Sequence, residues 1–231
     1  MNTPDLTLIY YTANVAPTHF TDHTRTQLIS AAGEIPLISV SKKPMDFGEN
    51  ICVGNTPRNQ YQIYKQALAG AKAATTPYIA LCEDDVLYSP EHFKFRPKDG
   101  HWGYNMNAWN LYTWGEPMFS YKAPGGRRNL NSLICQRQLF IDAMEERFSK
   151  WTEENFDLKT FGEPGKYDNQ LGTTAHPSQA FYTNPANVVF SHQTNLQFQG
   201  LGTRKGLGQV RAYAIPYWGD AGEIRSIYDL G

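Results

Sequence analysis

The chain has 231 residues, which is long enough for one large domain with a substantial hydrophobic core. Hydrophobic residues make up 41% of it and aromatic residues 13%, a composition that excludes a disordered chain. The formal net charge of −1 excludes binding of nucleic acid through a global positive field, so any such contact needs a local basic patch.

The start of the chain and its cysteines indicate the cellular compartment. Residues 1–5 carry no basic stretch, and the apolar run after them is too short for a signal peptide. No apolar run approaches the length of a membrane span, so we expect no membrane partner. The three cysteines, at positions 52, 82 and 135, have no metal-ligand spacing and are expected to be reduced thiols. These features predict a cytoplasmic protein.

The first forty residues predict a β-α-β unit. Residues 6–11 are rich in β-branched and aromatic side chains and predict a strand, 21–32 predict a helix, and 36–40 predict a second strand. Thr12 and Asn14 follow the first strand, where they would bind the base or ribose of a nucleotide. A helix cap or turn is the equally good alternative for this pair.

A polar loop and a second helix come next. Residues 41–56 predict a loop, and apolar residues recur at helical spacing over 57–74, with Thr56 as a suitable N-cap. Arg58 and Asn59 would lie near the positive end of this helix, where they would hold an anionic or polar part of a ligand. A solvated polar face of the helix is the alternative.

Three consecutive carboxylates, Glu83, Asp84 and Asp85, end a short apolar run over 78–82. Such a run, bounded by turn residues, predicts a buried strand of an α/β sheet, and ligands collect at the carboxyl ends of these strands. Adjacent carboxylates repel one another unless a cation neutralises them, and Mg²⁺ or Mn²⁺ takes oxygen ligands that it often shares with substrate phosphates. The alternative is an acidic turn that caps the next helix.

The segment 91–126 loses periodicity but is rich in aromatic residues. Disordered linkers are depleted in such residues, so we expect an ordered lobe over the acidic strand end, with rings available to an acceptor. A small hydrophobic core is the alternative for most of these rings. Lys122, Arg127 and Arg128 form a compact basic patch at the end of the segment.

Carboxylates and a histidine stand out in the last third of the chain. A polar segment, residues 152–170, carries Glu163 and Asp168 in a predicted loop and helix start. Residues 188–190 predict a late strand, which ends near His192. A histidine at this place is a potential metal ligand, and a purely structural role is the alternative.

Together these features are the parts of a metal-dependent transferase acting on a nucleoside diphosphate. The E-D-D triplet resembles the D-x-D motif of the GT-A glycosyltransferases. The resemblance implies an α/β fold, with a GT-A-like nucleotide-binding sheet flanked by helices and an aromatic-rich acceptor lobe. It implies a single domain over 1–231, in which residues 1–90 bind the nucleotide-sugar and residues 91–231 form the acceptor side.

The same resemblance implies the cofactors and their ligands. Asp85 would bind the divalent metal, Mn²⁺ or Mg²⁺, and His192 resembles the third metal contact that many GT-A enzymes draw from their carboxyl-terminal part. Glu83 or Asp84 would reach the ribose or an ordered water. The donor is expected to be a nucleotide-sugar, UDP-linked.

Further roles come from the same resemblance. Arg204 and Lys205, which lie among glycines, would clamp the pyrophosphate; a loop without a ligand is the alternative. The general base of an inverting enzyme is expected after the metal motif and an intervening helix. Asp168 is the first candidate for this base and Glu163 the second, with a helix cap as the alternative for Asp168.

A closer resemblance extends over most of the chain. It rests on residues 9–14, 40–51, 83–85, 191–195 and 204–206, which are similar to phage and metavirome glycosyltransferases associated with TET/JBP-type oxygenases. The resemblance implies transfer to a hydroxymethylated pyrimidine in DNA, in the cytoplasm of the phage host. Two other classes stay open: a nucleotidyltransferase, which also holds a metal at an acidic strand end, and a non-catalytic module that binds carbohydrate or DNA.

Overall fold

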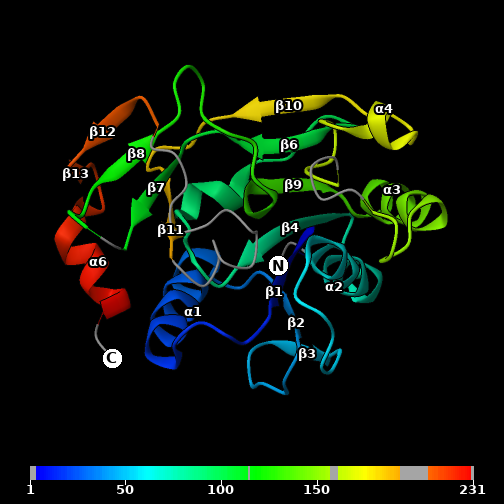
Figure 1. The fold of residues 1–231 in the computed structure, drawn as a ribbon, viewed down its shortest axis with the longest axis horizontal. Coiled ribbons are helices and arrows are strands. Elements are labelled where there is room, and N and C mark those ends of the chain that lie inside the picture. The colour runs from blue at the N-terminus through cyan, green and yellow to red at the C-terminus, as the bar shows by residue number, and fades with distance from the viewer. Residues whose placement is uncertain (1–3, 114, 157–160, 193–207, 230–231) are drawn as a thin grey trace.

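A central mixed sheet of seven strands forms the frame of the molecule (Figure 1). The computed structural model describes residues 4–113, 115–156, 161–192 and 208–229. The strand order is β10-β6-β9-β4-β1-β2-β3; the last four run parallel to one another, and β9 is antiparallel to both of its neighbours. The strands are β1 (Leu6–Thr12), β2 (Leu37–Ser41), β3 (Glu49–Cys52), β4 (Tyr78–Glu83), β6 (Trp102–Asn105), β9 (Leu133–Gln136) and β10 (Ser178–Phe181).

A second sheet of five strands, in the order β12-β8-β7-β11-β5, lies beside the first (Figure 1). Its strands are β5 (Val86–Leu87), β7 (Ala108–Tyr112), β8 (Phe119–Tyr121), β11 (Asn187–Ser191) and β12 (Val210–Ala212). A small ribbon, β13 (Ala214–Ile215) with β14 (Gly219–Asp220), follows it. Because β5 comes directly after β4 and pairs with β11, the second sheet brings the end of β11 to the acidic end of β4.

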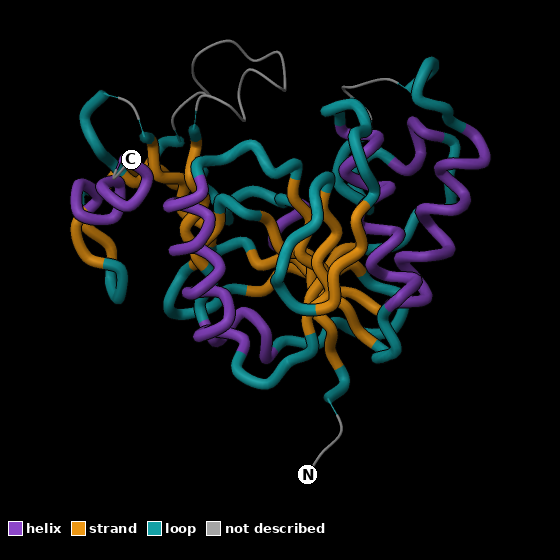
Figure 2. The backbone as a smooth tube through the Cα atoms, turned by 90° about the horizontal axis from the view of Figure 1, so that it is seen from below, coloured by secondary structure: helices purple, strands orange, loops and turns teal. Residues whose placement is uncertain are grey.

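Helices cover the sheets on two sides (Figure 2). On one side lie α1 and α6, which contact each other, and on the other lie α2 and α3. The helices are α1 (Thr18–Ala32), α2 (Gln60–Ala73), α3 (Arg137–Lys150), α4 (Asp168–Leu171) and α6 (Ala221–Asp229), with two 3-10 turns, η1 (Pro90–Lys94) and η2 (Leu130–Ser132). Among the described helices, none has the length and apolar character needed to cross a bilayer.

The sequence of strand β1 explains its place inside the sheet. Its side chains alternate between the two faces: Leu8 and Tyr10 pack in the cluster on the α1 side, while Ile9 and Tyr11 pack in the cluster on the α2 and α3 side. All seven residues are buried. A strand that is apolar on both faces fits only a sheet with both faces covered, and the predicted α/β fold with a helix-flanked sheet is confirmed.

Three expected elements differ from the structure. The loop expected over 41–56 contains β3, a half-exposed edge strand without an apolar alternation that would reveal it. Helix α2 starts at Gln60 and not at 57, because the Asn59 side chain accepts the Gln62 backbone N–H at 2.9 Å and acts as the N-cap. The aperiodic segment 91–126 contains three short strands.

Most rings of that segment belong to the hydrophobic core. The fully or almost fully buried ones are Phe93, Trp102, Tyr104, Tyr112 and Phe119. The hydrophobic-core alternative therefore holds for these residues, since rings so far from solvent offer no surface to an acceptor.

Candidate functional site

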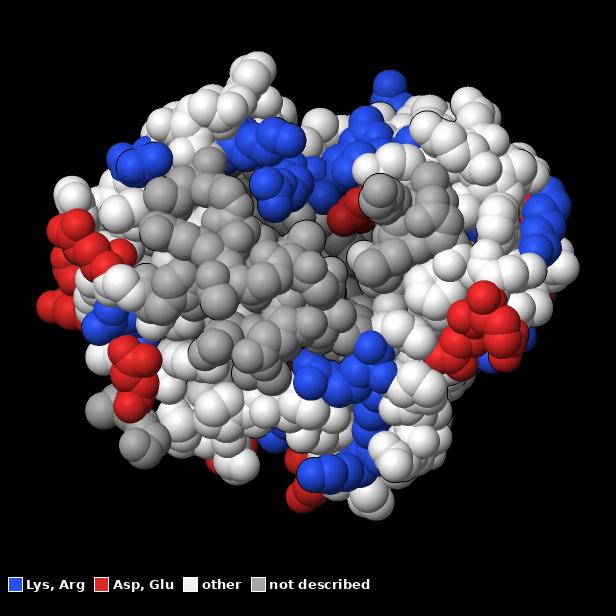
Figure 3. All heavy atoms as spheres, in the orientation of Figure 1, with Lys and Arg blue, Asp and Glu red and all other residues white. Residues whose placement is uncertain are grey.

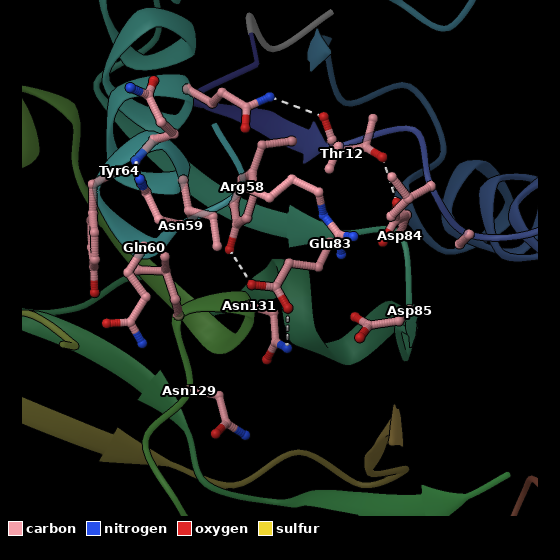
Figure 4. A pocket seen from close by; sticks show the side chains of 18 of the residues that line it. Thr12, Arg58, Asn59, Gln60, Tyr64, Glu83, Asp84, Asp85, Asn129 and Asn131 are labelled. Carbon is pink, nitrogen blue, oxygen red and sulfur yellow. Dashed lines mark hydrogen bonds between the residues drawn. The ribbon is translucent and has the colours of Figure 1, made fainter. Parts of the chain in front are cut away.

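A cavity of about 470 Å³ lies at the carboxyl ends of β1 and β4. This volume is within the range of small-molecule sites in proteins. In Figure 4, Asp84 and Asp85 lie at one side of the cavity, and Gln60 and Tyr64 at the other. The predicted site residues that line it are Thr12, Arg58, Asn59, Glu83, Asp84, Asp85, Glu163 and His192.

Glu83 is held by side chains from distant parts of the chain. The Tyr11 hydroxyl donates to Oε1 at 2.6 Å, and the Asn131 amide donates to Oε2 at 2.8 Å (Figure 4). The Tyr88 hydroxyl accepts the Glu83 backbone N–H at 3.1 Å and donates to the Asn131 carbonyl at 3.0 Å. Burial, followed by the charge of Asp85, raises the pKa of Glu83 to about 7. Both oxygens therefore have fixed positions, and a nearby cation would favour the charged form.

Asp84 is tied to the end of β1. The Thr12 hydroxyl donates to its Oδ2, and the Thr24 hydroxyl of α1 donates to its backbone carbonyl at 3.0 Å. Burial, followed by the charge of Asp85, raises the pKa of Asp84 to about 6. Two neighbouring carboxyls with raised pKa values mark a place where negative charge is crowded, which is what a divalent cation relieves.

Asp85, which precedes β5, and His192, which follows β11, meet at one end of the pair that these two strands form. His192 Nε2 lies 3.4 Å from Asp85 Oδ2, and the two residues are 4% and 3% exposed. The Phe190 backbone N–H donates to the Asp85 carbonyl at 2.8 Å, so the pairing of β11 with β5 fixes this approach. Within the described part of the chain, the buried His192 Nδ1 has no hydrogen-bond partner.

The donor set at this point fits a hard or borderline divalent cation. Carboxylate oxygens suit Mg²⁺ and Mn²⁺, and an imidazole nitrogen adds affinity for a transition metal. Among the described residues, no three His, Cys, Asp or Glu side chains already form a complete metal cage. Asp85 and His192 would thus supply part of the coordination, and water or phosphate oxygens would complete it, as is usual for Mg²⁺.

Basic side chains face the same cavity. Lys42, Arg58 and Arg127 line it, each from a different segment. Lys42 Nζ donates to the carbonyls of Thr56 and Pro57 at 2.6 and 2.7 Å, which holds the loop before α2 in place. Burial, followed by the charge of Arg58, lowers the pKa of Lys42. In the face of the molecule drawn in Figure 3, Lys and Arg side chains gather in groups above and below the middle. The cavity therefore combines a carboxylate end with surrounding cations.

Asn14 does not line the cavity. Its side-chain Oδ1 accepts the backbone N–H groups of Lys42 and Lys43 at 2.9 and 3.0 Å, which joins the loop after β1 to the loop after β2. The residue has φ of 53°, a left-handed conformation that asparagine tolerates better than most residues. The turn alternative describes Asn14 in this structure, and its contact with a base or ribose stays a prediction.

Asp168 also lies outside the cavity lining. Arg147 Nη2 donates to Asp168 Oδ1 at 2.8 Å, and the Gly165 backbone N–H donates to Oδ2 at 2.9 Å. With both oxygens engaged and the side chain buried, the geometry favours a structural role for Asp168, and its role as first candidate for the base stays a prediction. Glu163, the second candidate, lines the cavity.

Two further predictions have separate outcomes. Asn59 lines the cavity, but besides capping α2 its amide donates to Glu153 at 2.5 Å, so the side chain also organises the start of the helix. Arg204 and Lys205, the predicted pyrophosphate clamp, lie outside the described residues.

Some cavity residues carry no local sequence pattern. They are amide and hydroxyl side chains: Tyr11, Gln66 and Asn110, from the predicted first strand, second helix and aromatic segment, and Asn129 and Asn131, which lie in no predicted element. The one available sign is the run Asn129-Leu130-Asn131, which leads into η2 and comes directly after the basic patch. A polar run beside cations, close to a strand, is the kind of pattern that indicates a site.

Neither a protein-family model nor a curated protein matches the chain. Among solved structures, a glycosyltransferase involved in the glycosylation of the major capsid of PBCV-1 aligns with a TM-score of 0.49 and 9% identity, over 85% of this chain and 98% of that one. A nucleotidyl transferase from Methanothermobacter thermautotrophicus aligns with a TM-score of 0.42 and 10% identity, over 75% and 86%.

The bifunctional IspDF from Campylobacter jejuni aligns with a TM-score of 0.44 and 12% identity, over 84% of this chain; the chain spans 54% of the length of that protein. All three TM-scores lie below 0.5, so the chemistry of the site must be argued from its own residues.

Proposed function

We propose that this protein is a glycosyltransferase that moves a sugar from a nucleotide-sugar to an acceptor hydroxyl with the help of a divalent cation. The observation that carries the proposal is the cavity in which Asp85 and His192 meet beside two further carboxylates, with Lys42 and Arg58 also in the lining. A nucleoside diphosphate is negatively charged, so it needs both a cation between itself and the carboxylates and basic groups around it.

Each group then has a chemical task. Asp85 and His192 would hold the cation, which when bound would supply positive charge to the leaving diphosphate. Lys42 and Arg58 add positive charge on the donor side of the cavity. Glu163 takes the proton of the acceptor hydroxyl as the new bond to the sugar carbon forms. Arg204 and Lys205 remain the proposed pyrophosphate clamp.

The lining of the cavity supports a division of labour along the chain. Residues 1–90 contribute the acidic triplet, Lys42 and Arg58, which suit the charged donor. Residues 91–231 contribute neutral amides and Glu163, which suit a hydroxyl-bearing acceptor, together with Arg127 and the proposed cation ligand His192. We therefore propose a donor side and an acceptor side that belong to one domain.

A melting experiment tests the function. UDP and Mn²⁺ are added separately and together, and the melting temperature is measured. A ligand at 100 times its Kd stabilises by about 2.7 kcal/mol, which corresponds to a shift of roughly 5–10 °C for a chain of this size. We expect UDP to give such a shift only with Mn²⁺ present. The absence of a shift in every combination would overturn the proposal.

For the acceptor we propose a hydroxymethylated pyrimidine in DNA. The support is the resemblance to the phage enzymes and the basic patch, of which Arg127 lines the cavity, Arg128 lies half-buried beside it and Lys122 is exposed. The test compares transfer to duplex DNA with and without hydroxymethylated pyrimidine. Transfer to the modified duplex alone is expected, and equal transfer to a simple sugar would exclude DNA as the preferred acceptor.

A nucleotidyltransferase is the second candidate, because carboxylates beside Lys42 and Arg58 would also suit a nucleoside triphosphate with its cation. Pyrophosphate release separates the two functions. It is expected from a triphosphate and a sugar phosphate only if the second candidate is right.

A further inference from the structure

His192 lies in a cluster of rings that the C-terminal helix completes. The Tyr228 ring of α6 stacks on the His192 imidazole, with 5.6 Å between ring centroids and 29° between planes. Phe20 of α1 meets both rings edge-on, at 6.4 Å from His192 and 5.1 Å from Tyr228. The imidazole is thus held between Asp85 at one nitrogen and the Tyr228 ring on its face.

The Tyr228 ring is itself fixed by the docking of α6. His19 Nε2 lies 3.1 Å from the Tyr228 carbonyl, which joins the end of α6 to the start of α1. Ile224 and Ile227 of the same helix are partly buried against the cluster that contains Phe20. Helix α6 therefore presents Tyr228 from a packed surface, and the stacking geometry follows from the packing of one helix on the other.

The orientation of the His192 ring depends on this stacking, because Nδ1, its second ring nitrogen, makes no hydrogen bond to a described residue that would fix the ring plane. A histidine that binds a metal usually donates its other ring N–H to a carboxylate or carbonyl, which fixes the plane of the ring. In the described part of the chain, His192 Nδ1 is buried without a hydrogen-bond partner. Stacking on Tyr228, beside the more distant edge-on contact with Phe20, sets the ring plane in place of that hydrogen bond.

We propose that Tyr228 is a positioning residue: through it, helix α6 orients His192 toward Asp85 and so sets the affinity of the site for a divalent cation. The inference rests on the proposed function, since it takes Asp85 and His192 as cation ligands. It adds a role for the C-terminal helix, whose residues lie outside the cavity lining.

The test measures the dissociation constant of Mn²⁺ alone, by paramagnetic resonance of the free ion, for the full chain and five variants. Tyr228→Leu keeps an apolar side chain of α6 packed against α1 but removes the ring, and Tyr228→Phe keeps the ring. We expect Tyr228→Leu to weaken Mn²⁺ binding about tenfold, the lower end of the range for residues that orient a ligand. Tyr228→Phe should bind like the natural protein.

Ile227→Ala is the matched control, because Ile227 packs from α6 against the same cluster as Tyr228 but is not one of the stacked rings. It should lower the melting temperature and leave Mn²⁺ affinity unchanged. In a His192→Ala background, Tyr228→Leu should have no further effect, since Tyr228 acts through His192.

The outcomes separate the two proposals. Failure of the natural protein to bind Mn²⁺ would overturn the proposed function and this inference together. Equal Mn²⁺ affinity of the natural protein and Tyr228→Leu would overturn the inference alone. An equal loss in Ile227→Ala, or an undiminished loss in the His192→Ala background, would also overturn it, because either result would show that general packing is responsible.

Discussion

Arg147 and Asp168 form an ion pair of 2.8 Å whose side chains are almost completely withdrawn from water, with 1% and 6% exposed. Arg147 also donates to the Gly162 carbonyl at 2.8 Å, and Asp168 accepts the Gly165 backbone N–H. The pair therefore anchors both ends of the short loop that carries Glu163 to the cavity. The pair thereby fixes the position of Glu163, the proposed general base.

Asp168→Asn should strongly destabilise the protein. The substitution keeps the shape of the side chain but leaves the Arg147 charge buried without its counterion, and breaking such pairs costs about 3–5 kcal/mol. Urea unfolding gives the free energy directly. The control is Glu91→Gln in the exposed pair with Lys94, which should change stability by less than about 1 kcal/mol. A similarly small change in Asp168→Asn would contradict the structural role.

Glu163→Gln should remove transfer while donor binding survives. Glutamine fills the same space but cannot accept the proton of the acceptor hydroxyl, and general-base catalysis contributes about 10²–10⁴-fold. Rates of sugar transfer and the UDP-dependent melting shift in Mn²⁺ are measured side by side. Near-normal transfer would show that no carboxylate base acts at this position, as expected for a retaining mechanism.

Asp85→Asn should abolish the Mn²⁺-dependent melting shift without unfolding the protein. The side chain is 3% exposed, so the reason for tolerance is electrostatic and not exposure. Burial, followed by the charge of Asp85, raises the pKa values of Glu83 and Asp84, and removing that charge relieves the repulsion and offsets the lost contacts. Circular dichroism should stay near that of the natural protein. A large loss of folded structure would assign Asp85 a purely structural role.

His92 is fully buried in neutral form. Its Nδ1 accepts from the amides of Asn105 and Asn187 at 3.2 and 3.3 Å. The amide orientations are fixed, because their oxygens accept the backbone N–H groups of Asn107 and Ser89 at 3.0 Å. Burial lowers the pKa of His92 from 6.5 to about 3.

The contribution of His92 to the free energy of unfolding should therefore decrease as the pH falls from about 6.5 toward 3, because in this window the unfolded chain binds a proton at His92 and the folded protein does not. This contribution is about 1.4 kcal/mol per pH unit, while Glu83 and Asp84, whose pKa values are raised, act in the opposite direction. His92→Gln keeps an acceptor for the two amides and cannot titrate, so the difference in stability between the natural protein and this variant should shift toward the variant as the pH falls. Parallel curves for the two proteins, from urea unfolding at several pH values, would refute this assignment.

Central strands are the part of the fold that the sequence predicts best. Strands β1 and β4 consist almost entirely of buried residues, so their apolar runs are visible without any tertiary information. Edge strand β3 is half-exposed and has no such run, because only β2 pairs with it. The strands between 91 and 126 are only three to five residues long within irregular chain, too short to show a period.

The site is predictable only where its residues are adjacent in sequence. Glu83, Asp84 and Asp85 stand out together, but Tyr11 and Asn131, which hold Glu83, come from 72 and 48 residues away. No local pattern links such positions, because tertiary packing creates the pairing. The same limit applies to the ion pair of Asp168, whose partner Arg147 belongs to the buried face of an otherwise ordinary amphipathic helix.

The position of β4 between β1 and β9 limits how this protein can be divided or recombined. A chimera built by exchanging residues 1–90 as a nucleotide-binding cassette would separate β4 from β9, which the chain supplies only at residues 133–136. Strand β4 of the exchanged segment would then have unpaired backbone N–H and C=O groups along one edge. Such an edge can pair with other chains and promotes aggregation. Exchange of donor specificity between such proteins is thus better attempted by grafting single loops onto an intact sheet.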